Sequence, residues 1–344
     1  MTYRWSLGAL NHGLDDPQGW FRHLRHRDHL AGLPVLENET AQLGPGSPDM
    51  RSIVALGRDL IIGRIRIEPR LSAHVVLDPG WLFVMLPLSW KTEFRFNGHT
   101  ALPNDLLLTS SRDGYATLGE KRDNLGIGVR KDKLSAVLRA VSGNFEDDFD
   151  LVDQNIALGE FQARYLRQSF LACFSGSEFR TLSKGRVLLH ETVETHLISL
   201  LALVLLPHVT VGSCASSGRI DPRHVVRRAL RAYEIKPPER VTLEDLCRTA
   251  GVGGYLLHTC FVDLYGVSPM SYQRARRLRQ ARAMLLDEDA PPRSVKDVSL
   301  AMGFINGGRF ASEYAALFGE KPSDTFPTGS ERWNAERAAS AGIR

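Results

Sequence analysis

The spacing of hydrophobic positions changes along the chain. Between residues 53 and 130 hydrophobic and polar residues alternate in short runs, such as residues 92–96, which lead into an Asn97-Gly98 dipeptide. Alternation with a period of two is typical of half-buried strands, and Asn-Gly is a strong signal for a tight hairpin turn. Several such runs separated by turn residues predict a small antiparallel β-barrel or sandwich.

Further along, hydrophobic residues recur at every third or fourth position. Residues 161–174 and 185–206 each fit one helix, and the second carries an apolar face wide enough to pack on the barrel or on a second subunit. The sequence leaves those two uses open. A stretch rich in glycine and serine at 211–220 follows and predicts a linker.

The C-terminal part contains an internal repeat. Residues 241–252 are repeated as residues 294–304, so that Thr242 aligns with Ser294, Gly251 with Gly303, and Phe261 with Tyr314 after one extra residue. We interpret the repeat as two helix-turn-helix units, at about 242–265 and 294–318. The predicted organisation is an irregular segment 1–50, a barrel 51–145, a helical packing or dimerisation region 146–210, a linker 211–220, a helical domain 221–326 and a tail 327–344.

Each unit carries its own helix signals. Thr242 and Ser294 are predicted N-caps, with Asp245 at the capping-box position of the first unit, and Gly251 and Gly303 are expected at the turns, where left-handed backbone favours glycine. The second helices of the units are predicted at about 254–265 and 307–318.

A third helix is predicted between the units, from Pro269 to about Leu286, with Ser268 as its cap. Its 17 or so residues span roughly 26 Å. A rigid spacer of that length can hold two helices about one duplex turn apart, roughly 34 Å, in successive major grooves of DNA. Several arginines lie along it, of which Arg276 and Arg279 are predicted to contact phosphates, whereas Arg277 or Arg282 would hold the two units together.

Composition and charge narrow the function. The 344 residues are 43% hydrophobic, no apolar run is long enough to cross a bilayer, and no signal peptide is visible, so we expect a cytoplasmic multidomain protein without a membrane partner. Residues 219–326 hold 17 Lys and Arg against 13 Asp and Glu, whereas residues 1–218 hold 23 against 24. The modest excess favours a polyanion partner for the C-terminal part alone.

The predicted barrel offers no enzyme chemistry. His74 and His99 lack the partners that a metal site needs, the four cysteines are far apart, and no phosphate loop or nucleophile motif is present. We therefore expect no catalytic residue, metal or cofactor. A small organic effector is a more plausible ligand, because barrel mouths are common binding sites, although aromatic residues on strands more often form core. The aromatic candidates for its pocket are Trp81, Phe83, Trp90, Phe94 and Phe96.

Residues 241–326 resemble the DNA-binding domain of the AraC/XylS family of bacterial transcription regulators. The matching positions include Gly251-Val252, Gly266-Val-Ser-Pro269, Gly303-Phe304 and the run from Leu317 to Ser323. The resemblance implies a DNA-binding regulator whose N-terminal part is a cupin-like sensing and dimerisation module, giving an α+β multidomain fold with an all-α C-terminal domain. It also implies double-stranded DNA, RNA polymerase and a second copy of the chain as partners.

The two recognition helices depart from the family pattern. Tyr255 and Thr259 stand where arginine is usual, as does Ser312, and glycine pairs open both helices. Arg309 is therefore the strongest candidate for a guanine contact. The predicted DNA-binding residues are Arg309, His258, Tyr255, Thr259, Ser312, Asn306, Gly307, Arg276 and Arg279.

The sequence supports one main interpretation and two rival interpretations. In the main interpretation, the protein is a sequence-specific transcription regulator. It would be an effector-responsive activator with modest base readout. In the first rival, the regulator acts mainly through protein contacts, because its substitutions weaken DNA recognition. The second rival is a cupin-type enzyme fused to a helical domain. The effector, the operator and the sign of regulation are not specified by the sequence.

Overall fold

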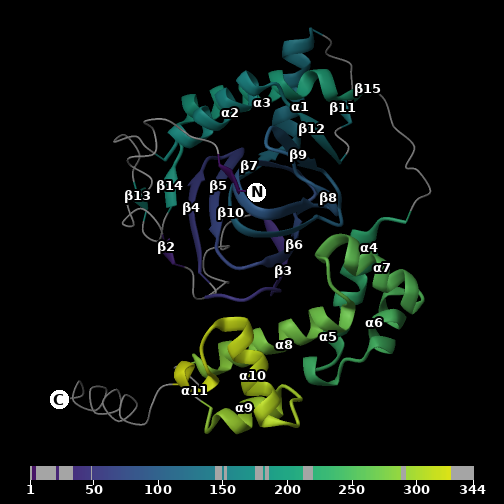
Figure 1. Ribbon diagram of the computed structural model, residues 1–344. Helices are drawn as coiled ribbons and strands as arrows, with labels where there is room; N and C mark the ends of the chain where they lie inside the picture. The colour runs from purple at the N-terminus through teal and green to yellow at the C-terminus, as the bar shows by residue number, and fades with distance from the viewer. Residues whose placement is uncertain are drawn as a thin grey trace, which may run out of the picture.

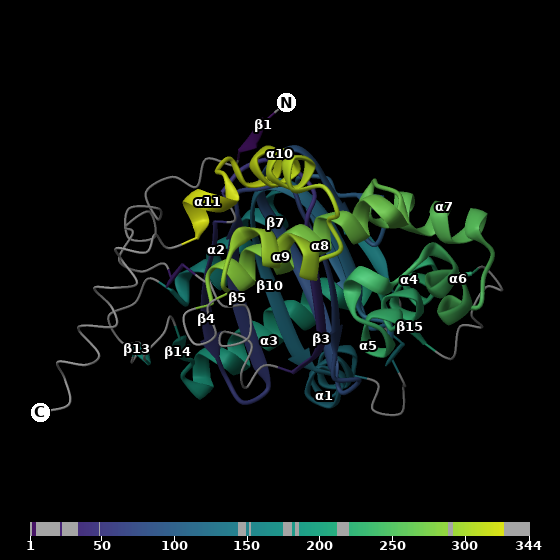
Figure 2. The same cartoon turned by 90° about the horizontal axis from the view of Figure 1, so that it is seen from below.

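In the computed structural model, a large β-sheet lies between two groups of helices (Figure 1). The structure describes residues 2–4, 21–22, 34–47, 49–143, 149–150, 153–174, 181–182, 186–211, 220–287 and 292–326. Helices α1 to α3 cover one side of the sheet, and the C-terminal helices lie against the other side, with α8 running along β3 (Figure 2).

The strands form a branched sheet. Its main path runs β12-β9-β7-β10-β5-β4-β14-β13, and β6 pairs with both β10 and β3. The strands on the main path and this branch are β3 (Val35–Gln42), β4 (Met50–Leu56), β5 (Leu60–Ile67), β6 (Leu71–Leu77), β7 (Trp81–Phe96), β9 (Asp105–Thr109), β10 (Tyr115–Arg130), β12 (Gln154–Ala157), β13 (Thr181–Leu182) and β14 (Arg186–Leu188). The short strands β1 (Thr2–Arg4) and β8 (His99–Thr100) pair with β7, and β2 (Phe21–Arg22) pairs with β4; β11 (Phe149–Asp150) and β15 (Thr210–Val211) form a separate pair.

The prediction of a closed, antiparallel barrel is wrong in two respects. Among the described residues the sheet does not close, and β14 joins β4 in parallel, so the sheet is mixed. Alternation along single strands predicted the strands themselves, but closure depends on which distant edges pair. Residues 35–42, which were assigned to an irregular segment, form β3 because β6 supplies its partner.

The two longest strands, β7 and β10, carry the bend of the sheet. Their pairing shifts register between Gly119 and Asn124, and Thr92 and Lys121 adopt positive φ angles of 68° and 44°. Such bulges bend a strand and change the direction of nearby side chains. After the bulge, β10 pairs with β5 along one of its edges. Before the bulge, β10 pairs with β6.

Helices α1 (Lys131–Ser142), α2 (Glu160–Ala172) and α3 (Glu191–Leu205) share a buried apolar core with one face of the sheet. This core includes Leu82, Leu125 and Ile127 from the strands, and Leu166 and Leu201 from the helices. The helices predicted near 161–174 and 185–206 are therefore present, with the second one shorter than expected because residues 186–188 form β14.

The C-terminal half is helical, as the repeat predicted. It contains α4 (Pro222–Leu230), α5 (Ala232–Ile235), a 3-10 turn (Pro238–Arg240), α6 (Leu243–Ala250), α7 (Gly254–Tyr265), α8 (Pro269–Leu285), α9 (Val295–Ala301), α10 (Gly307–Phe318) and α11 (Pro322–Thr325). The predicted caps are confirmed: the side chains of Thr242, Ser268 and Ser294 each accept a backbone N–H, and Gly251 and Gly303 have φ angles of 70° and 73°.

The two helix-turn-helix units have different cores. The core of the first unit, around Leu246, Phe261 and Tyr272, also contains Ala41 and Ala116 from the sheet. The core of the second unit, around Phe310 and Tyr314, is built from residues of the C-terminal helices. The apolar core of the first unit thus extends into the N-terminal half. The second unit contacts that half through the Leu317 carbonyl, which accepts from the Gln42 side chain at 2.9 Å and from the Gly46 N–H at 3.0 Å.

Two of the predicted segments have little or no structural description. The tail 327–344 and most of the linker, residues 212–219, lie outside the described residues, as does Cys214. In the described part of the chain, the structure has no helix long and apolar enough to cross a membrane. Nor do three or more His, Cys, Asp or Glu side chains come together there in a group that could hold a metal ion.

Candidate nucleic-acid interface

Helix α10 presents its first turn to solvent. Asn306 caps the helix by accepting the N–H of Arg309 at 3.0 Å, and Gly307, Gly308 and Arg309 are all exposed. Ile305, just before the cap, is 95% exposed. An exposed helix N-terminus with an exposed arginine and little side-chain bulk can approach a phosphate backbone closely and reach base edges.

Arg309 is held by a neighbouring acid. Its Nε donates to Oε1 of Glu313 at 2.8 Å, and Nη1 of Arg274 lies 3.4 Å from the same oxygen. The Arg309 side chain is 65% exposed, so this ion pair is weak and can be exchanged for another partner. Ser312 is exposed on the same helix.

Helix α7 presents fewer polar groups. Tyr255 is 88% exposed and His258 is exposed, whereas Thr259 is half-buried and its hydroxyl donates to the Tyr255 carbonyl at 3.1 Å. The Thr259 hydroxyl is thus already bonded within its own helix. Tyr255 and His258 are the side chains of this helix best placed to contact a partner.

The two arginines of α8 predicted to contact phosphates face the sheet instead. Nη2 of Arg276 donates to Glu39 at 3.0 Å, and its guanidinium lies 3.9 Å above the ring of Tyr233. Arg279 donates to the carbonyl and hydroxyl oxygens of Thr40. Burial lowers the pKa of Arg279. In this arrangement both arginine side chains are bound to β3. A role for them in DNA binding therefore requires the sheet to move away.

The other α8 arginines hold the second unit together. Nη1 of Arg282 donates to the Tyr314 hydroxyl and to Thr325, each at 3.2 Å, and is paired with Glu320. The guanidinium of Arg277 lies 4.7 Å from the centre of the Phe304 ring. Both arginines thus join α8 to the second unit, and the role of holding the two units together stays a prediction.

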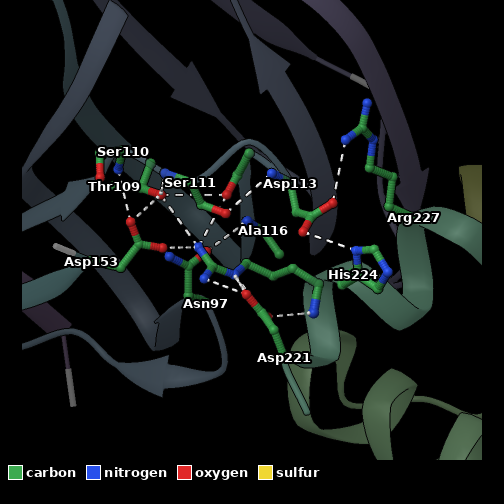
Figure 3. Close-up of polar contacts among 12 residues, drawn as sticks. Asn97, Thr109, Ser110, Ser111, Asp113, Ala116, Asp153, Asp221, His224 and Arg227 are labelled. Atoms are coloured by element: carbon green, nitrogen blue, oxygen red, sulfur yellow. Dashed lines mark hydrogen bonds and ion pairs between the residues drawn. The ribbon is translucent and has the colours of Figure 1, made fainter. Parts of the chain in front are cut away.

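Helix α4 forms a second polar contact with the sheet (Figure 3). Arg227 is paired with Glu37 at 2.5 Å and with Asp113 at 3.3 Å, and Nδ1 of His224 lies 3.1 Å from the other Asp113 oxygen. The guanidinium of Arg227 lowers the pKa of Glu37. These contacts fix the start of the helical half against the turn before β10.

Arg223, one residue before His224, reaches deeper into the same contact. Its Nη1 donates to the Gly114 carbonyl at 3.1 Å and is paired with Asp153, while Nη2 is paired with Asp221 at 2.6 Å. Asp153 in turn accepts from the Thr109 hydroxyl at 2.9 Å. One arginine thus joins three segments that are far apart in sequence.

A buried histidine links α7 to the same turn. Nε2 of His74 donates to the Asp113 carbonyl at 2.8 Å, and the Tyr265 hydroxyl donates to Nδ1 at 3.1 Å. A carbonyl only accepts, which assigns the proton to Nε2. Burial lowers the pKa of His74, so the ring is neutral.

The aromatic residues predicted to bind an effector lie together. Phe83, Trp90, Phe94 and Phe96 belong to one buried cluster with Tyr115, and the half-buried Trp81 packs beside Gly128. The Phe83 and Tyr115 rings are stacked, with centroids 4.1 Å apart. Sequence reasoning found the aromatics of β7 but missed Tyr115, because β10 meets them only in the folded sheet.

Comparison with known proteins agrees with this arrangement. A family model described as a helix-turn-helix domain matches residues 246–327. The XylDLEGF operon transcriptional activator 2 of Pseudomonas putida is 32% identical over 133 residues, which are 39% of this chain and 84% of that relative. The chain belongs to the AraC/XylS family. It is thus a DNA-binding transcription regulator and not an enzyme, as the sequence predicted.

Two other members of the AraC/XylS family match a smaller part of this chain. The XylDLEGF operon transcriptional activator 3 of Pseudomonas putida is 37% identical over 106 residues, so the chain spans about a third of that relative, 32% of its length. A probable AraC family transcriptional regulator from Rhodopseudomonas palustris is 34% identical, covering 29% of this chain and 93% of the solved chain, with a TM-score of 0.27.

Ile305 and the ion pairs around Arg309 were not predicted from the sequence, although Arg274 and Glu313 themselves were expected on the surface of their helices. Ile305 is a large apolar side chain left almost fully exposed beside a recognition helix, and a methyl-bearing side chain there can contact a thymine methyl group. Arg274 and Glu313 set the charge around Arg309. The spacing of Arg309 and Glu313, four residues apart on one helix, was a signal that could have found their ion pair.

Proposed function

We propose that this regulator activates transcription by placing α7 and α10 in successive major grooves of an operator. The observation that carries the proposal is the exposure of the first turns of α7 and α10, two helices that are connected through α8. The 17 residues of α8 span roughly 26 Å, which suits helices docked about one duplex turn apart. Arg309, Asn306, Gly307 and Ser312 would contact DNA from α10, and Tyr255, His258 and Thr259 from α7.

Base readout is expected to be modest. Among the predicted contacts of the recognition helices, Arg309 is the one side chain suited to a bidentate guanine contact, and the glycines carry no reading group. Affinity would then depend on phosphate contacts and DNA shape. Arg276 and Arg279 would add phosphate contacts after release from β3.

The N-terminal half would sense a small-molecule effector. The aromatic cluster of β7 lies on a sheet that contacts α4, α7 and α8, so a ligand that shifts the sheet would change how the DNA-binding helices are held. We further propose a cupin-like sensing role for residues 51–145, a homodimer through the region 146–210, a DNA-binding domain at 221–326, and RNA polymerase as a partner.

The test is selection of genomic DNA by the full chain, followed by sequencing. We expect one enriched motif whose promoter-length duplex binds more tightly than random DNA at equal salt. Arg309→Ala should cost about 1–3 kcal/mol of specific binding and relax the preference for a guanine. Arg164→Ala is the matched control, because Arg164 is also exposed and paired four residues away, with Glu160, on α2. Equal binding of the selected and random duplexes would disprove specific readout.

A regulator that acts mainly through protein contacts is the second candidate. The glycine pairs and the small number of arginines on the recognition helices favour it. In that case Arg309→Ala would leave both DNA binding and reporter output unchanged, whereas substitution of Tyr255 would reduce reporter output alone.

A further inference from the structure

The C-terminal end of α10 is held by the N-terminal half. The last four carbonyl groups of a helix have no N–H partner of the regular helical pattern, so they need partners from elsewhere. In α10 the Leu317 carbonyl accepts from the Gly46 N–H at 3.0 Å and from Nε2 of Gln42 at 2.9 Å. These donors belong to the last residue of β3 and to the loop of residues 43–47 that follows it. The exposed first turn of α10 lies at the opposite end of the helix, so this contact leaves that turn uncovered.

Gln42 holds the 43–47 loop as well as α10. The residue is 2% exposed, and its Nε2 also donates to the Gly44 carbonyl at 3.1 Å and to the Gly46 carbonyl at 2.8 Å. One side-chain amide therefore fixes the shape of the loop and joins it to the helix. Gly46 has a φ angle of 129°, which residues with a side chain rarely adopt, so the shape of the loop also depends on this glycine.

The C-terminal end of α7 lies against the base of the same loop. The Arg70 carbonyl accepts from the N–H groups of Leu43 and Gly44, at 2.7 and 3.2 Å. The Arg70 guanidinium lies beside the C-cap of α7, because a Cβ added to Gly266 would be 2.9 Å from Nη2. A cation is favourable there, since the C-terminal end of a helix carries partial negative charge. One connected part of the sheet thus touches the ends of both recognition helices.

The two helix-turn-helix units share α8 but not an apolar core. Tyr272, in the first half of α8, belongs to the core of the first unit, and Leu278, further along, belongs to that of the second. A helix of 17 residues can curve, so α8 alone leaves the two units some freedom of movement. A contact that holds both units to the sheet restricts how far the recognition helices can shift relative to each other.

We propose that Gln42, through the 43–47 loop, is a specificity-determining residue that sets the distance between the two DNA segments recognised by α7 and α10. It is a positioning residue, since it acts on DNA through α10. One base pair shifts a segment by about 3.4 Å along the duplex and turns it by about 35°. Recognition helices that are held at both C-terminal ends cannot follow that shift, so the docked chain accepts one spacing. The inference rests on the proposed docking of α7 and α10 in successive major grooves.

Release of the sheet would change this selectivity. Glu39 and Thr40, which bind Arg276 and Arg279, lie just before Gln42 on β3. A movement of the sheet that frees the two arginines for phosphate would therefore free α10 as well. The docked chain would bind DNA more weakly and with a strict spacing, whereas the released chain would bind more tightly and accept other spacings.

The test measures the affinity of the full chain for three duplexes. One is the duplex enriched in the selection described above, and the other two are copies with one base pair inserted or removed midway between the recognised segments. The natural chain should bind the altered duplexes at least about tenfold more weakly, because a segment out of register loses the Arg309 contact. Fluorescence anisotropy at equal salt gives the three affinities.

Two variants loosen the contact in different ways. Gln42→Met keeps the approximate size of the side chain and removes its donor group. Each hydrogen bond contributes about two- to twelvefold to an equilibrium, so the spacing penalty should fall to about threefold or less. It should fall because the altered duplexes bind more tightly, whereas a merely destabilised chain would bind all three duplexes more weakly. Gly46→Ala should act in the same direction while Gln42 remains, because a φ angle of 129° disfavours a side chain.

Two control variants match these changes elsewhere in the N-terminal half. Gln154→Met removes a glutamine whose Nε2 donates to the His208 carbonyl at 3.1 Å. Gly143→Ala changes a glycine with a φ angle of 73° at the end of α1. Both controls should keep the full spacing penalty.

Hydrogen exchange provides a readout without DNA. The Gly46 amide donates to the Leu317 carbonyl, so it should exchange slowly in the natural chain and faster in Gln42→Met. Gln154→Met should exchange at this amide like the natural chain.

The inference is overturned if the natural chain binds the altered duplexes as well as the selected one, or if Gln42→Met keeps the full spacing penalty. Equal loss of affinity for all three duplexes in Gln42→Met, or equal exchange of the Gly46 amide in both chains, would also overturn it. A natural chain that prefers no duplex would overturn the proposed function together with the inference. That result is distinguishable, because the Gly46 amide would still exchange differently in the two chains.

Discussion

The arginine side chains of this protein differ mainly in the groups that they contact. Arg309 shares a half-buried acid, Glu313, with Arg274, whereas Arg276 and Arg279 are bound by the sheet. The same residue type is therefore exposed for an outside partner at one place and used for contacts inside the molecule at another. The partner, rather than the position in sequence, decides among these uses.

Glu313 is expected to restrain Arg309. Glu313→Gln removes the charge that binds Arg309 and Arg274, so DNA affinity should rise about 1.4- to fivefold, the equivalent of a surface ion pair of about 0.2–1 kcal/mol. The slope of log affinity against log salt should also steepen, because more cation is free to meet phosphate. Fluorescence anisotropy across a salt series measures both effects. Glu160→Gln, at the matched pair on α2, should change neither.

His74 should make the structure sensitive to acid. Its pKa is lowered in the folded state, so the unfolded chain takes up a proton first as pH falls below about 6.5, and stability is lost from there down to the folded pKa. Protonation would also remove the bond from the Tyr265 hydroxyl. Thermal unfolding at pH 7.5 and 5.5 should show a larger loss of Tm for the natural chain than for His74→Gln. An equal loss in both would assign the acid sensitivity to other groups.

At the scale of elements, α10 has a capping side chain, Asn306, but begins with two glycines, which have low helix propensity. Gly307 has open space around it and a Cβ there would meet no atom within 4 Å. Gly307→Ala should therefore stabilise the chain by about 0.4–1 kcal/mol through the unfolded state. DNA affinity should fall at the same time, because the added methyl group keeps the helix terminus further from the phosphates. Urea unfolding and duplex binding measure the two effects, and increases in both would show that the glycine has no role in DNA contact.

The sequence predicted elements with local signals and missed arrangements that depend on distant partners. Thr242, Ser268 and Ser294 could be identified as caps because capping involves residues three apart. The direction of Arg276 could not, since Glu39 is 237 residues away. Sheet closure depends equally on non-local packing. For the candidate DNA surface, the helices and Arg309 were accessible from sequence, whereas its coupling to the sheet was not.

At the scale of the whole molecule, the DNA-binding half is held by acids on the sheet. Glu37 binds Arg227 and Glu39 binds Arg276, so β3 touches both α4 and α8. Glu37→Gln combined with Glu39→Gln should weaken this contact. We expect tighter duplex binding and a reporter that is less dependent on any effector, because the basic face of α8 becomes free for phosphate. Asp59→Asn, which changes an acid at the other end of the sheet near Arg130, is the control.

Small-angle scattering provides an independent reading of the same double variant. Its radius of gyration should increase if the two halves separate. Unchanged size together with unchanged duplex binding would show that these acids do not restrain the DNA-binding half.

The unequal cores of the two helix-turn-helix units have a consequence for how such proteins can be recombined. The first unit buries Ala41 and Ala116 of the sheet beside its own Phe261 and Tyr272 of α8, so its interior is completed by the N-terminal half. The second unit needs no such contribution from the sheet among the described residues. If α4 to α11 were grafted onto a foreign N-terminal half, the first unit would lose part of its apolar core. The apolar core of the second unit would be carried over complete. The junction of a chimaeric regulator is therefore better placed within α8, between the two units, than at the linker that precedes α4.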